Sequence, residues 1–162
     1  KNSERDRATP AVMTKKRYFN IEQANRMIPT LEYTFGRLLQ LHAQIREVHA
    51  RLTAAGFGPP DDDFELDPPE ASIEVRSDLA SLRTLIDGLR EDVIELAQTG
   101  CVVKSIDSGL VDWYAELDGR DILLCWKLGE KSVEYWHEID SGFAGRQPVS
   151  VLKPTLAGYS IS

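Results

Sequence analysis

The sequence predicts an α+β protein: a long antiparallel helical hairpin, coiled-coil-like, packed with a small antiparallel β-meander of three to four strands. Two apolar stripes with helical spacing, in residues 31–52 and 75–96, predict the hairpin. Beyond residue 110 the apolar period falls to two, and Asp118-Gly119 separates two strand-like runs, as in a β-hairpin. We expect a flexible N-terminal arm at 1–17, one domain at 18–152 and a C-terminal tail at 153–162.

The first helix is expected at about residues 21–55. Asn20 and Gln23 have the spacing of a capping box at its start, and Pro29 predicts a kink or a break after the first turns. Glycines and prolines at 56–60 end it. Apolar residues recur along it at a spacing of seven: Leu31, Leu38, Ile45 and Leu52.

The second helix is expected at about residues 70–99, after an acidic loop that we interpret as a solvated connector rather than a calcium site. Its apolar positions alternate in steps of four and three, which gives a narrow stripe suited to a partner helix. The two stripes favour pairing of the helices and self-association of the chain.

The expected strands are residues 110–117, 120–127 and 132–139, with a fourth from 102–106 or 148–152. The Asp-Gly turn pairs Asp112 with Cys125. A second turn centred on residues 129–130 would pair Cys125 with Glu134 and Ile122 with His137. This register predicts His137 on the apolar, helix-facing side, and Cys125 on a mixed side with Trp136.

Composition and charge exclude several classes of partner. The net charge is -7, whereas nucleic acids and anionic membranes bind basic surfaces. No apolar run reaches the roughly 20 residues that span a bilayer, and no signal-peptide pattern opens the chain. We expect a cytoplasmic protein that binds neither nucleic acid nor membrane, with Cys101 and Cys125 as buried free thiols.

Three segments, RYFNIEQAN, SGLVDWYAELDGRDILLCWKLGE and YWHEIDSGFAGRQP, resemble the bacterial family known as domain of unknown function 2203. They follow the family's order from Tyr18 to Pro148, and Trp113 stands where the family usually has phenylalanine. The resemblance implies no activity, but it directs attention to the motif positions: Glu22, Asn25, Asp112, Cys125, Trp126, Glu130, His137, Glu138, Asp140 and Arg146.

The candidate metal ligands are His137, Glu138 and Asp140, with Asp112 or Glu134 nearby. One imidazole with carboxylates suits iron, manganese or zinc, so a divalent metal ion is a candidate cofactor. Adjacent strand residues point to opposite faces, so these ligands converge only if the strand bends after His137. The predicted register also separates the Cys125 thiol from the imidazole, which argues against a cysteine nucleophile.

The segment SGFAGRQP suits a small anionic ligand. Its glycines allow unusual backbone conformations, Arg146 offers a planar fork of donors, and Phe143 is expected to anchor the loop in the core. We favour the alternative that Arg146 pairs structurally with Asp140, Glu138 or Glu22, because the chain is rich in acidic residues. The candidate ligand-binding residues are Trp136, Gly142, Phe143, Gly145, Arg146 and Glu22.

Two functions stay open on the sequence. The first is a non-catalytic ligand-binding or protein-interaction module that forms a homo-oligomer through its helical hairpin. The alternative is a small metal-dependent or acid/base enzyme with a site around His137, Glu138, Asp140 and Arg146. We favour the first, because spacing alone places no complete catalytic set.

Overall fold

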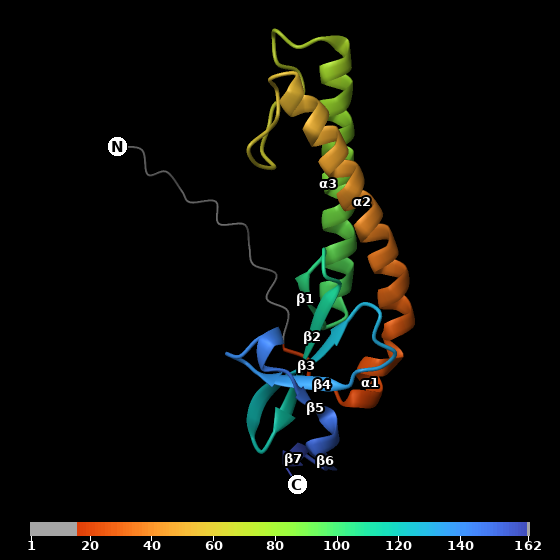
Figure 1. Cartoon of the computed structure of the whole chain (residues 1–162), viewed down its shortest axis with the longest axis vertical. Helices are drawn as coiled ribbons and strands as arrows, with labels where there is room; N and C mark the ends of the chain where they lie inside the picture. The colour runs from red at the N-terminus through yellow and green to blue at the C-terminus, as the bar shows by residue number, and fades with distance from the viewer. Residues whose placement is uncertain (1–15, 162) are drawn as a thin grey trace, which may run out of the picture.

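The computed structural model describes residues 16–161 and confirms the α+β class (Figure 1). Most of the expected N-terminal arm, residues 1–15, lies outside the described residues. The helices within 16–161 are α1 (Ile21–Arg26), α2 (Ile28–Ala54) and α3 (Ile73–Gln98). The strands are β1 (Val102–Ser105), β2 (Leu110–Leu117), β3 (Arg120–Lys127), β4 (Tyr135–Glu138), β5 (Gln147–Pro148), β6 (Leu152–Thr155) and β7 (Gly158–Ile161). None of the helices in this range has both the length and the apolar character needed to cross a membrane.

The predicted first helix is two helices, with a break at Met27. The capping box is confirmed: Asn20 Oδ1 accepts from the Gln23 backbone N–H at 2.7 Å, and Gln23 Oε1 accepts from the Asn20 N–H at 2.9 Å. Pro29 lies in the first turn of α2. A proline is tolerated there, because the first backbone N–H groups of a helix have no intrahelical acceptor.

The long helices α2 and α3 run side by side away from the sheet (Figure 1). Their distal halves share a buried apolar cluster: Val48, Leu52, Val75, Leu79, Leu82 and Ile86. The acidic loop between them folds back on α3, where Arg83 donates to the Asp62 carbonyl at 2.6 Å and Arg90 pairs with the Asp62 carboxylate. These contacts support the interpretation of the loop as a connector.

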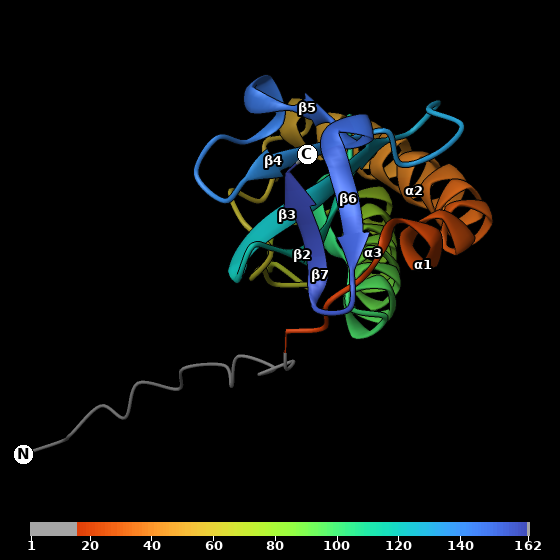
Figure 2. The same cartoon turned by 90° about the horizontal axis from the view of Figure 1, so that it is seen from below.

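The sheet is larger than the predicted meander of three to four antiparallel strands, and it is mixed. Seven strands are described, in the order β5-β4-β3-β2-β7-β6, with β1 also pairing with β2. Strand β7 pairs in parallel with the end of β2, where Leu117 meets Tyr159 (Figure 2). The expected tail at 153–162 therefore supplies strands. Its short runs, with Pro154 inside β6 and Gly158 opening β7, carry no long alternating pattern.

The predicted register is confirmed for the first hairpin and wrong for the second. Asp112 pairs with Cys125, and the turn residues Asp118 and Gly119 have φ values of 48° and 80°, as a type I′ turn requires. In the β3–β4 pair, however, Cys125 meets Tyr135 rather than Glu134. His137 correspondingly pairs with Leu123 rather than Ile122, so every β4 side chain lies on the face opposite to the one predicted.

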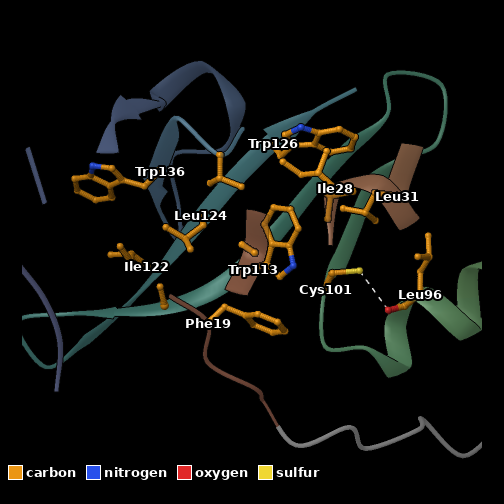
Figure 3. Packing of buried hydrophobic residues seen from close by; sticks show 14 of the residues in the cluster. Phe19, Ile28, Leu31, Leu96, Cys101, Trp113, Ile122, Leu124, Trp126 and Trp136 are labelled. Atoms are coloured by element: carbon orange, nitrogen blue, oxygen red, sulfur yellow. Dashed lines mark hydrogen bonds between the residues drawn. The ribbon is translucent and has the colours of Figure 1, made fainter. Parts of the chain in front are cut away.

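The helix-facing side of the sheet forms the main core (Figure 3). Its three tryptophans, Trp113, Trp126 and Trp136, are at most 1% exposed. Trp126 packs near Phe35 of α2, with the ring centroids 6.4 Å apart. Because β4 is shifted by one residue, Trp136 belongs to this core and not to the mixed face, where we expected it.

Candidate functional site

Three side chains with different donor atoms meet on the sheet face that points away from the main core. Asp112 lies on β2, Cys125 on β3 and His137 on β4, and we call them the Asp–Cys–His cluster. One ligand atom from each lies within 4.8 Å of the other two. All three residues are at most 2% exposed. The predicted separation of Cys125 from His137 is therefore wrong, because the one-residue shift of β4 moves the imidazole to the thiol's face.

The hydrogen bonds of His137 orient its ring toward Asp112. Nδ1 lies 2.7 Å from the Glu138 carbonyl oxygen, and Nε2 lies 3.0 Å from Asp112 Oδ2. A carbonyl only accepts, so Nδ1 carries a proton and donates it. The other carboxylate oxygen, Asp112 Oδ1, is buried and has no hydrogen-bond partner within residues 16–161.

The environment of Cys125 keeps its thiol protonated. Burial raises the pKa of this thiol to about 12, assisted by the negative charge of Asp112 and opposed by the positive charge of Arg146. A nucleophilic cysteine needs a lowered pKa, since the thiolate is the reactive form. The cluster therefore lacks the electrostatics of a cysteine nucleophile although thiol and imidazole share one face.

Arg146 covers the same face next to the cluster. Its Nη2 donates to the two carboxylate oxygens of Glu130 at 2.6 and 2.8 Å, so the expected pairing with Asp140, Glu138 or Glu22 is wrong. Its guanidinium carbon lies 4.0 Å from the ring centroid of Tyr135, the residue that pairs with Cys125.

The glycine-rich loop holds Arg146 in place. Gly142 has a φ of 59°, which favours glycine, and a Cβ at Gly145 would lie 2.5 Å from the Ser141 side chain. Phe143 is 44% exposed, so the expectation that it anchors the loop in the core is wrong. Its ring centroid lies 4.7 Å from the guanidinium carbon of Arg146, which it shields from water.

The predicted metal ligands do not converge. Glu138 lies on the opposite face from His137, pairing with Ile122, and it forms an exposed ion pair with Arg120. The hydrogen bond from that arginine lowers the pKa of Glu138. Asp140 is exposed in the turn that follows β4. The turn after β4 therefore does not bring the side chains of His137, Glu138 and Asp140 together.

Glu22 is separate from the cluster as well. Its carboxylate pairs with Arg26 on α1 at 2.6 Å, and both side chains are more than two-thirds exposed. It borders a cleft of about 650 Å³ beside β6 and β7, whose lining includes neither Arg146 nor the cluster: Asn20, Ile21, Glu22, Asn25, Arg26, Pro154 and Tyr159.

The sequence predicted part of the cluster, because the first hairpin already placed Asp112 beside Cys125. It missed His137 as their neighbour and Glu130 as the partner of Arg146. The available signal was positional, since these five residues all lie in the segments that carry the family resemblance.

Comparison with known proteins gives the family and no activity. Neither a curated protein nor a solved structure matches the chain. One family model, described as "Uncharacterized conserved protein (DUF2203)", matches residues 17–149, a range that includes the Asp–Cys–His cluster, Glu130 and Arg146 and ends before β6. The chain therefore belongs to the DUF2203 family, as its sequence motifs predicted.

Proposed function

We propose that this protein binds one divalent transition-metal ion, zinc by its donor set, through Asp112, Cys125 and His137. The observation that carries the proposal is the convergence of a carboxylate, a thiol and an imidazole on one buried spot, with Asp112 Oδ1 unpartnered. Leaving a buried polar atom without a partner costs about 1–3 kcal/mol, and more for a charged group. A bound cation removes that cost.

The distances suit an ion of this size. Zinc binds sulfur at about 2.3 Å and nitrogen or oxygen at about 2.0–2.2 Å in a tetrahedral arrangement, so two of its ligand atoms lie roughly 3.3–3.7 Å apart. The donors of the cluster lie within 4.8 Å of one another, and the His137–Asp112 pair at 3.0 Å. A shift of up to about 1 Å in the longest of these separations would bring the three donors around one ion.

The orientation of the imidazole also supports a metal site. A metal-binding histidine usually donates its other ring N–H to a carbonyl or carboxylate, which fixes the ring. His137 donates from Nδ1 to the Glu138 carbonyl and directs Nε2 into the cluster. A metal ion would take the place of the thiol proton of Cys125, because cysteine binds metals as the thiolate.

Among the functions that the sequence leaves open, this arrangement favours the metal-dependent enzyme. Three protein ligands leave a fourth position for water or substrate, whereas structural zinc sites use four protein ligands. The site would be built on Asp112, Cys125 and His137 in place of Glu138 and Asp140.

Self-association stays a second proposal. The distal apolar residues of α2 and α3 pack together, and Leu52, Leu79 and Leu82 are at most 2% exposed, so a homo-oligomer would use other faces. Large exposed side chains on those faces, Tyr33 and Ile94, support a contact there. Sedimentation equilibrium tests it: a mass that stays at one chain at every concentration would refute the homo-oligomer.

Cobalt(II) substitution tests the metal site directly. The chain, freed of metal by a chelator, is titrated with Co²⁺ and then Zn²⁺. We expect one equivalent of Co²⁺ to bind and to give a thiolate-to-cobalt charge-transfer band. One equivalent of Zn²⁺ should then bind in its place. Cys125→Ser removes the band, and Asp112→Asn weakens binding.

Cys101→Ser is the matched control. Cys101 is also buried, and its thiol donates to the Leu96 carbonyl at the end of α3 (Figure 3). It belongs to the main core and not to the Asp–Cys–His cluster. This variant keeps the band. A wild-type chain that binds no Co²⁺, or equal loss in the two cysteine variants, would contradict the proposal.

A further inference from the structure

Arg146 places a cation with an unused donor beside the proposed metal site. Its side chain is 12% exposed, and its Nε atom is buried without a partner within residues 16–161. The aromatic rings of Tyr135 and Phe143 lie 4.0 and 4.7 Å from its guanidinium carbon. Water is thereby kept from a charge that prefers to bind an anion through two parallel N–H groups.

Glu130 satisfies this arginine only in part. Both of its carboxylate oxygens accept from the single atom Nη2, and Nε is left over. Glu130 Oε1 also accepts from the Lys127 backbone N–H at 2.6 Å, and this bond holds the carboxylate where it does not accept from Nε of Arg146. A carboxylate that accepts from Nε and Nη2 together would fit the guanidinium better. Glu130 thus leaves part of the donor capacity of Arg146 unused.

The arginine and the cluster are neighbours on one face. Arg146 lies over Tyr135, which pairs with Cys125, and its Nη2 lies 3.5 Å from the Cys125 carbonyl oxygen. An anion held by Arg146 therefore borders the cluster.

We propose that the site takes a small carboxylate, which binds Arg146 in place of Glu130 and occupies the free fourth position of the metal ion. This inference rests on the proposed metal site and adds the class of ligand. Arg146 is the residue that recognises the anion, and Glu130 competes with the ligand until it is displaced.

The test uses the full chain loaded with Co²⁺ and titrated with oxalate, followed by the cobalt d–d spectrum and by calorimetry. We expect oxalate to change the spectrum and Arg146→Gln to weaken its binding about ten- to hundredfold, the equivalent of one charge-assisted hydrogen bond. Glu130→Gln removes the competing charge and tightens binding. Arg120→Gln, which breaks the ion pair with Glu138 on the opposite face, leaves oxalate affinity unchanged.

The outcomes separate the two proposals. A charge-transfer band with oxalate affinity unaltered in both Arg146→Gln and Glu130→Gln overturns the carboxylate site and leaves the metal site standing. If Arg146→Gln does not fold, an unaltered oxalate affinity in Glu130→Gln is by itself sufficient to overturn the carboxylate site. Absence of the band in the wild-type chain overturns both.

Discussion

Replacing Tyr159 tests whether the last ten residues belong to the domain. The phenol of this β7 residue is 5% exposed and packs in the main core, and its oxygen accepts a hydrogen bond from the backbone N–H of Ile21, at the start of α1. Burial raises its pKa above the ordinary value. A residue in a loose tail would have neither this burial nor this hydrogen bond.

The structure sets the expected loss of stability for two variants. Tyr159→Phe keeps the ring and leaves the Ile21 N–H without its acceptor, which costs about 1–3 kcal/mol when no water replaces it. This N–H borders the cleft beside α1, so we expect about 1 kcal/mol. Tyr159→Ala also removes a buried ring, for a total of about 3–5 kcal/mol.

Urea denaturation followed by circular dichroism measures both values. For a chain of this size, each 1 kcal/mol also lowers Tm by about 2–4 °C. Tyr33→Phe is the control, because Tyr33 is 71% exposed on α2 and should change stability by no more than about 0.5 kcal/mol. If Tyr159→Ala matched that control, β7 would not be part of the folded sheet and the packing argument would fail.

Three further variants test other parts of the fold by the same denaturation assay. Gly158→Ala should cost more than about 1 kcal/mol, because φ is 146° and the added Cβ would lie 2.5 Å from a backbone oxygen of β2; stability equal to the wild type would contradict this strain. Asn25→Ala should cost about 1–3 kcal/mol, since its side chain accepts from the Val133 N–H at 2.6 Å, and a neutral result would mean that water replaces it. The hydrogen bond from Tyr18 lowers the pKa of Asp121 in the folded chain, so its stabilisation is complete above about pH 4 and is lost as pH falls through the folded pKa. Asp121→Asn should therefore remove part of the loss of stability below about pH 4, and an unchanged pH profile would refute that contribution.

The two β-hairpins show how far local sequence reaches. The Asp118-Gly119 turn has two residues and a required backbone conformation, so it set the β2–β3 register, including Asp112 beside Cys125. The connection from β3 to β4 spans residues 128–134, and no local rule fixes which residues of the two strands pair across a loop of this length. Near its end, the Val133 backbone N–H donates to Asn25 Oδ1 of α1, 108 residues away.

The candidate site depends on that difference. Shifting a strand by one residue moves every side chain to the other face. The predicted register therefore placed His137 on the face opposite to Cys125, and Trp136 outside the core. The pairing of Arg146 with Glu130 joins two loops that flank β4, and charge alone allowed several acidic partners.

Local signals in the sequence by itself determined the α+β class, the capping box of α1, the first hairpin and the family. Only the tertiary structure decided the face of β4, the position of Arg146 and the addition of β6 and β7 to the sheet. The physical reason is the range of the interactions, because caps and two-residue turns act between neighbours in the chain. Packing and hydrogen bonds between distant residues set the register across a longer loop and a parallel contact such as Leu117 with Tyr159.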